Sequence, residues 1–149
     1  MMENVIRRIT ASSAGYDTLP LRIGAGVIFA AHGAQKLFGW FGGYGLQGTG
    51  EWMASIGLEP GVLMAAMAGS AEFFGGLALI LGLLLRPAAV VLALTMVVAI
   101  VTVHLSNGLF MANNGYEFGL ALLAVSVGLA IRGAGSASID RLLSDRLAG

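Results

Sequence analysis

The chain contains no cysteine and few charged residues. Without cysteine, its own side chains provide no disulfide, no thiol nucleophile and no thiolate ligand for an iron–sulfur cluster. Only 11% of the residues are charged while 57% are hydrophobic, a balance that leaves too little charge to cover the surface of a soluble domain. The eight basic and eight acidic residues cancel, so the overall charge does not indicate a nucleic-acid partner. With a mean hydropathy of +0.85, the composition predicts an integral membrane protein whose first partner is the lipid bilayer.

Four segments are long and apolar enough to approach the length of a membrane-spanning helix. A hydrocarbon core of about 30 Å needs about 20 helical residues. We interpret Arg86-Pro87 as the turn between the second and third segments, because proline is favoured in the first turn of a helix. We therefore predict an all-α integral membrane protein, a four-transmembrane-helix bundle, with spans at about 21–40, 62–85, 87–105 and 116–131. The membrane domain (19–132) follows a cytoplasmic N-terminal tail (1–18) and precedes a cytoplasmic amphipathic C-terminal helix (133–149).

The basic residues favour one orientation of these spans. With four spans, all seven arginines fall on one side, which the positive-inside rule places in the cytoplasm together with both termini. Trp40 and Trp52 fall on the other side, where aromatic side chains are typical of the membrane interface. The first outer loop is predicted to form a short interfacial helix, which Thr49 caps and Gly57 ends, as a lid over the bundle.

Glu72 lies near the middle of the second span, where an unpaired charge costs about 2.5–3.5 kcal/mol. At helical periodicity Glu72 shares its face with small residues, which line helix–helix contacts in membranes, so we expect it to point into the bundle. The opposite face is bulky and is expected to meet lipid. Glu117 repeats the arrangement in the fourth span, with Ala121, Ala124 and Gly128 on its face.

Six polar side chains are predicted to meet at one level in the outer half of the bilayer. Counted from the nearest cytoplasmic arginine at about 1.5 Å per residue, four of them lie on the order of 21–27 Å away. We expect Lys36 and Glu72 to pair, and the alternative is that such a pair serves only to set the register of two helices. The six residues are His32, Gln35, Lys36, Glu72, His104 and Glu117.

Other sites are disfavoured. The segment GYGLQG (43–48) has the spacing of a dinucleotide-binding loop but follows a predicted membrane helix instead of a strand. A haem between His32 and His104 is disfavoured because their predicted depths differ by about two helical turns. A metal site is disfavoured because no Glu-x-x-His spacing is present.

Similar segments at 32–38 and 104–110 indicate two related two-helix halves. A proton or small-solute pathway would require several copies of the chain.

Three segments carry a resemblance to a known family: RIGAGVIFAAHGAQKLFGWFGG, AAMAGSAEFFGGLALILGLLLR and VTVHLSNGLF with GYEF. With the pattern HG-x-x-K-x-x-G-W, the sequence over about residues 20–145 resembles the DoxX family of small four-helix bacterial membrane proteins. The resemblance implies a multi-pass protein of the bacterial inner membrane. Related DoxD-type proteins are membrane subunits of thiosulfate–quinone oxidoreductase systems, and DoxX-type proteins are linked to membrane redox assemblies. The matching positions are His32, Lys36, Glu72, His104 and Glu117.

Two functions follow as hypotheses. In the first, the protein is a quinone-interacting membrane subunit: His32, Gln35, Lys36 and His104 bind the ligand while Glu72 and Glu117 relay protons. Because the chain has no flavin or iron–sulfur motif, electrons would come from a partner, in a larger membrane redox complex or a homo-oligomer. In the second, it is a non-catalytic accessory or assembly subunit of such a complex, and the polar layer only holds the bundle together.

Overall fold

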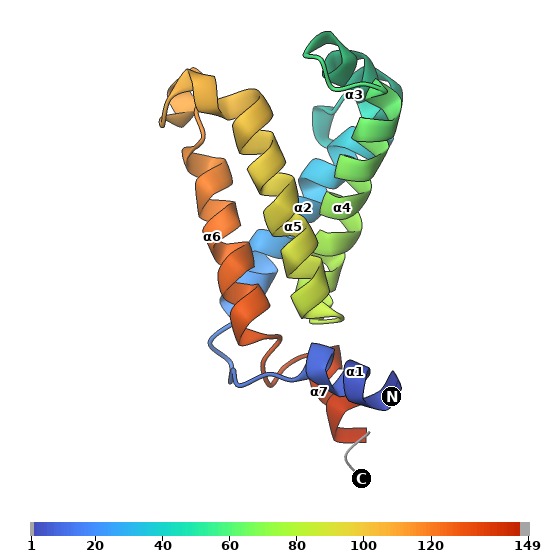
Figure 1. Ribbon diagram of the computed structural model, residues 1–149, viewed down its shortest axis with the longest axis vertical. Coiled ribbons are helices and arrows are strands. Elements are labelled where there is room, and N and C mark those ends of the chain that lie inside the picture. The colour runs from blue at the N-terminus through green and yellow to red at the C-terminus, as the bar shows by residue number, and fades with distance from the viewer. Residues whose placement is uncertain (1, 147–149) are drawn as a thin grey trace.

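The computed structural model describes residues 2–146, with side chains from residue 5 onward, as helices joined by turns (Figure 1). Within this range it contains no β-strand, so the all-α prediction is confirmed. The ends of the predicted tail and C-terminal helix, residue 1 and residues 147–149, lie outside the described residues. The α-helices are α1 (Met2–Thr10), α2 (Leu19–Phe38), α3 (Gly45–Ser55), α4 (Gly61–Leu81), α5 (Leu85–Ala99), α6 (Glu117–Arg132) and α7 (Ile139–Arg146).

The long helices form two pairs. α2 packs along α4, and α5 packs along α6. In Figure 1 the two pairs lie close together at the lower end, beside α1 and α7, and diverge toward the upper end, where α3 covers the tips of α2 and α4. The hydrophobic core lies between the pairs and includes Phe29 of α2, Leu79 of α4, Leu92 of α5 and Leu129 of α6.

Two of these helices are long and apolar enough to cross a membrane by length and composition. They are Gly61–Leu81 and Leu85–Asn107, the second including the short π-helix Ile100–His104 and the 3₁₀ turn Leu105–Asn107 that continue α5. The bulky face of α4 is exposed, as predicted: Met67 is 60% and Phe74 62% accessible. Exposed apolar side chains of this size are suited to contact with lipid.

α2 and α4 approach each other closely because glycines meet at their interface. A methyl group added at Gly33 would lie 2.6 Å from the Cα of Phe73 and 2.7 Å from the carbonyl oxygen of Gly69. One added at Gly76 would lie 2.6 Å from the carbonyl oxygen of Gly26. Backbone contact of this kind is the usual way in which small residues join membrane helices. It brings the polar side chains of the two helices within reach of one another.

Three local predictions need correction. The turn between the second and third spans lies at residues 82–84, with Gly82 (φ 62°) and Leu84 (φ 47°) in the left-handed region, and α5 already begins at Leu85. The helix in the first outer loop begins at Gly45, so Thr49 is buried inside α3 and does not cap it. The N-terminal tail contains α1, which packs against α7 and α5 and was not predicted.

The lower end of the bundle is held by two buried charged side chains. The Arg22 side chain is 1% exposed, and its guanidinium donates to the carbonyl oxygens of Leu79 (2.9 Å) and Ile80 (3.0 Å) at the end of α4. It also donates to the carbonyl oxygens of Ala134 and Ala137, in the segment before α7. The Asp140 carboxylate accepts from the backbone N–H groups of Leu84 (2.8 Å) and Leu85 (2.9 Å), at the start of α5. Without them the carbonyl oxygen of Ile80 and the N–H groups of Leu84 and Leu85 would have no hydrogen-bond partner among the described residues.

Candidate ligand site between α2 and α4

Lys36 of α2 and Glu72 of α4 form the ion pair that the sequence predicted. Nζ of Lys36 donates to Oε2 of Glu72 at 2.6 Å. The Glu72 side chain is 6% exposed and that of Lys36 24%, so the pair lies at the edge of the interface and is not sealed within it. Glu72 shares its buried face with Ala65, Gly69 and Gly76, which confirms that it points into the bundle.

The pair leaves hydrogen-bonding capacity unused. An ammonium group has three N–H donors, and within the described residues Lys36 uses only one of them. Oε1 of Glu72 likewise accepts no hydrogen bond from the described part of the chain. A small polar group arriving at the exposed side of the pair would therefore find both a donor and an acceptor.

His32 lies one helical turn before Lys36 on the same side of α2. It is exposed, and its ring centroid lies 6.2 Å from that of Phe118 of α6, across the space between the two helix pairs. Neither ring nitrogen hydrogen-bonds to any other described residue. An ammonium, a carboxylate and an imidazole thus stand next to one another on the α2–α4 pair.

The other three predicted polar residues each form a hydrogen bond with a backbone group that is near in the sequence. Gln35 Nε2 donates to the carbonyl oxygen of Phe41 (3.3 Å). His104 Nδ1 is 2.9 Å from the carbonyl oxygen of Asn114, and Glu117 Oε1 accepts from the backbone N–H of Met111 (2.6 Å). In the described chain, therefore, the six side chains do not form one hydrogen-bonded cluster.

The predicted orientation of the fourth span is wrong. Ala121, Ala124 and Gly128 are exposed, whereas Leu122, Ser126 and Leu129 are buried on the opposite face of α6. Leu122 and Leu129 belong to the hydrophobic core together with Leu92 and Met96 of α5, so the leucine face of α6 is the one that is buried. The position in the second half that corresponds to Lys36 is Gly108, which leaves Glu117 without a basic partner in its own half.

The two tryptophans predicted at the outer interface lie at the end of the molecule where α3 packs on α2 and α4. Trp40 is 55% exposed, and its ring stacks at a tilt on Phe38, with centroids 5.1 Å apart. Phe38 in turn meets Phe73 edge to face at 5.3 Å. Trp52 is 42% exposed on α3. An aromatic group thus lines the upper end of the α2–α4 pair, within two turns of Lys36.

Three features escaped the sequence analysis. The π-helix Ile100–His104 has no marker in residue type, although such turns often accompany functional sites. The roles of Arg22 and Asp140 depend on segments distant in sequence, so no local pattern could indicate them. Ser126 is fully buried in α6, and its hydroxyl has no hydrogen-bond partner in the described chain.

The fold and site define an all-helical protein with an ion pair between two closely packed apolar helices. A family model named DoxX matches residues 18–105. The chain is also 37% identical over 123 residues to a protein of Bacillus subtilis (strain 168) named "Putative oxidoreductase CatD". The aligned region covers 83% of this chain and 84% of that protein. No solved structure was found to match. The chain therefore belongs to the DoxX family of membrane proteins.

Proposed function

We propose that this protein is a four-span subunit of the bacterial inner membrane that binds the headgroup of a quinone beside Lys36 and Glu72. In this topology α2, α4, α5 and α6 cross the membrane, and α1 and α7 lie on the cytoplasmic side. The distribution of charge supports this topology. The seven arginines lie toward the end of the molecule that carries α1 and α7. The opposite end carries Glu51, Glu59, Glu72 and Glu117.

The depth of the ion pair supports a ligand that is itself dissolved in the membrane. Lys36 and Glu72 each stand 14 residues from an arginine of the cytoplasmic end. At 1.5 Å per residue this is about 21 Å into a hydrocarbon layer of about 30 Å. A ligand that reaches a partly exposed ammonium at this depth comes from the bilayer more readily than from water. Quinones have this character, with a polar ring on an apolar tail.

The observation that carries the proposal is the composition of the site: an ammonium with unused donors, a carboxylate with an unused acceptor, and a neighbouring unbonded imidazole. A quinone carbonyl accepts hydrogen bonds, which Lys36 and His32 supply. A quinol hydroxyl donates one, which Glu72 accepts. Reduction of a quinone takes up two electrons and two protons; the imidazole and the carboxylate supply positions from which protons exchange.

The electrons come from a partner in this proposal. The chain has no cysteine for an iron–sulfur cluster, and nothing in its sequence indicates a flavin site. The relative in Bacillus subtilis carries the word oxidoreductase in its name, which agrees with a place in a redox assembly. The protein thus supplies the quinone-binding and proton-exchanging part of a larger reaction.

The test is to purify the protein in mild detergent, extract bound quinone and titrate the depleted protein with a short-tailed quinone. We expect saturable binding that His32→Asn and Lys36→Met weaken at least tenfold. His104→Asn is the matched control, because His104 bonds within its own outer loop. If no quinone is bound or extracted, or if both histidine variants bind alike, the proposed site is wrong.

A second candidate function is that of a non-catalytic accessory subunit that docks partners. It is favoured by exposed apolar side chains outside the long helices, namely Trp52 (42%) on α3 and Leu142 (64%) and Leu143 (37%) on α7. In that case Glu72→Gln leaves the activity of the complex intact, whereas Trp52→Ala or Leu143→Ala releases the subunit during co-purification. The opposite pattern favours the quinone site.

A further inference from the structure

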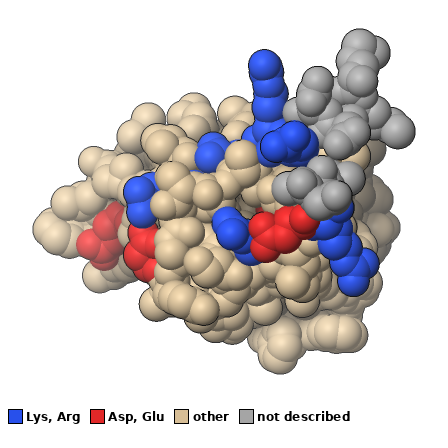
Figure 2. All heavy atoms as spheres, turned by 90° about the horizontal axis from the view of Figure 1, so that it is seen from below, with Lys and Arg blue, Asp and Glu red and all other residues tan. Residues whose placement is uncertain are grey.

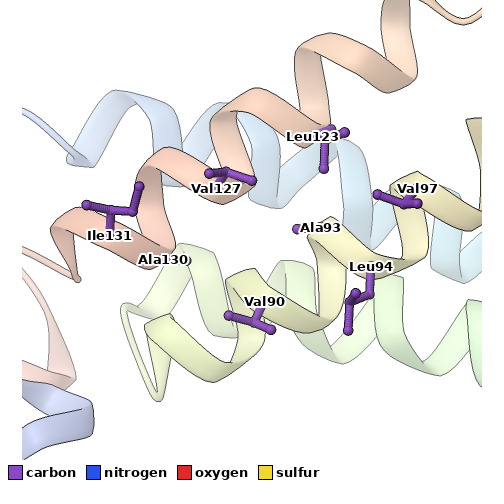
Figure 3. Close-up of a pocket in the computed structure, with 8 residues that line it drawn as sticks. All are labelled: Val90, Ala93, Leu94, Val97, Leu123, Val127, Ala130 and Ile131. Carbon is purple, nitrogen blue, oxygen red and sulfur yellow. The ribbon is translucent and has the colours of Figure 1, made fainter.

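A groove of about 340 Å³ runs between α5 and α6 (Figure 3). It extends along α5 from Val90 to Val97, about 10 Å at the helical rise of 1.5 Å per residue. Figure 3 shows side chains of both helices turned toward the space between them. All eight lining residues are aliphatic: Val90, Ala93, Leu94, Val97, Leu123, Val127, Ala130 and Ile131.

Such a lining accepts an apolar chain but does not select one. In a bilayer the alternative environment is hydrocarbon and not water, so burial against valine and leucine has little driving force of its own. Selectivity must therefore come from the polar group attached to that chain. The groove ends on the side of Arg86 and Arg132, the first charged residues below it on α5 and α6.

Arg86 is bound to the wall of the groove. Its Nη1 donates to the carbonyl oxygen of Ala130 (2.8 Å), a lining residue, and its Nε to that of Ala11 (3.0 Å). Nη2 makes no hydrogen bond to the described chain. The guanidinium is therefore held in place with donors to spare, a suitable arrangement for binding phosphate oxygens.

Arg132 directly follows Ile131 of the groove and is 50% exposed. One of its nitrogens, Nη2, pairs with Asp17 at 2.6 Å, and Asp17 is the acidic group that faces it. The Asp17 carboxylate offsets one positive charge but leaves Nε and Nη1 of Arg132 without a partner among the described residues. The two arginines together keep a net positive charge at the mouth of the groove.

The surrounding end of the molecule is also basic. Viewed from below, Figure 2 shows Lys and Arg side chains spread over this end, with a few Asp and Glu among them. Among the residues whose side chains the structure describes, seven arginines stand there against Asp17, Asp140 and Asp145, a net charge of +4. Basic clusters on the cytoplasmic side of membrane proteins attract anionic lipids.

We propose that the groove between α5 and α6 binds one acyl chain of an anionic phospholipid, whose phosphate lies against Arg86 and Arg132. This inference rests on the topology proposed above and not on the quinone site, which lies on the other helix pair. Loss of quinone binding would leave it unchanged, and loss of lipid selectivity would leave the quinone site unchanged.

The test compares two lipids of equal acyl chains on delipidated protein by native mass spectrometry: dioleoylphosphatidylglycerol, which is anionic, and dioleoylphosphatidylcholine, which is zwitterionic. We expect the anionic lipid to bind at least about fivefold more tightly, the preference expected from one arginine near a membrane surface. Arg132→Gln should lower this preference severalfold. Arg141→Gln is the matched control, because Arg141 is similarly exposed (56%) and also paired with an aspartate, but lies on α7.

The acyl chain is tested separately. Ala93→Phe fills the groove and should reduce retention of the anionic lipid, whereas Ala124→Phe, on the exposed face of α6, should not. Equal affinity for both lipids, equal effects of Arg132→Gln and Arg141→Gln, or unchanged retention in a folded Ala93→Phe variant would each overturn the proposal. So would a dimer that Ala93→Phe dissociates while lipid binding stays the same, because the groove would then hold a second copy of the chain.

Discussion

The Lys36–Glu72 ion pair provides the sharpest prediction about stability. We consider a double-mutant cycle of Lys36→Met, Glu72→Met and the double variant, in which methionine keeps much of the side-chain length and removes the charge. Each single change leaves the other charge unpaired in an apolar setting. Breaking a buried pair in this way costs about 3–5 kcal/mol in soluble proteins, and an isolated charge at the centre of a membrane helix about 2.5–3.5 kcal/mol.

The partial exposure of Lys36 sets the expected size. Because the Lys36 side chain is 24% exposed and Glu72 only 6%, loss of the lysine should be the more costly change, since it isolates the deeper charge. We expect about 2–3 kcal/mol for Lys36→Met, somewhat less for Glu72→Met, and a coupling energy of about 1–3 kcal/mol between them. The double variant should therefore be more stable than the sum of the single losses implies.

The assay is reversible unfolding in mixed detergent micelles, followed by far-ultraviolet circular dichroism. The exposed pair Arg141–Asp145, with nitrogen and oxygen 3.0 Å apart, is the control and should show a coupling of only about 0.3–0.5 kcal/mol. Strict additivity for Lys36 and Glu72, or a coupling no larger than that of the control pair, would refute the argument that these two charges stabilise each other.

Three further predictions concern packing, the buried arginine and pH. Gly33→Val should destabilise the protein by about 1–3 kcal/mol, because α2 and α4 must separate to make room for the side chain. Gly128→Val should cost little in the same unfolding assay, because the space around Gly128 is open. Arg22→Met should cost about 3 kcal/mol or prevent folding, because it removes the hydrogen-bond donor of the Ile80 and Ala137 carbonyl oxygens at the buried end of the bundle; normal yield and stability would contradict this. Hydrogen bonding to Arg132 lowers the pKa of Asp17 below its usual value of 3.8, so the pair should stabilise the protein above that pH and lose its contribution as pH falls through the lowered pKa. Asp17→Asn should remove that part of the acid dependence, and identical acid unfolding of both proteins would show that the pair does not contribute.

The four long helices and their approximate ends could be predicted from the sequence, whereas α1 could not. The second predicted span, 62–85, and α4 (Gly61–Leu81) differ mainly at the C-terminal end. The turn that was predicted at Arg86-Pro87 lies at residues 82–84, where Gly82 and Leu84 adopt left-handed backbone conformations. The buried face of α4 and the Lys36–Glu72 pair were also correctly predicted. In both cases small residues and a costly charge left few arrangements to choose from.

The arrangement of the second helix pair could not be predicted in the same way. Ala121, Ala124 and Gly128 have the pattern of a buried stripe, yet they are exposed. A small residue permits close contact but does not require it, and Leu122 and Leu129 are buried in the core instead. His104 Nδ1 lies 2.9 Å from the carbonyl oxygen of Asn114, and Glu117 Oε1 accepts from the N–H of Met111 at 2.6 Å. Both partners belong to the loop between α5 and α6, so neither side chain needs a partner across the bundle.

The sequence by itself determined that the chain is an all-helical membrane protein of the DoxX family, because composition, hydrophobic length and a spaced set of residues do not depend on contacts between distant segments. Only the tertiary structure decided which polar groups meet. The rotation of each helix about its axis depends on how all its neighbours pack, and the buried bonds of Arg22 and Asp140 join segments more than fifty residues apart. The proposed ligand site on α2 and α4 and the arginine-flanked groove on α5 and α6 both follow from those rotations.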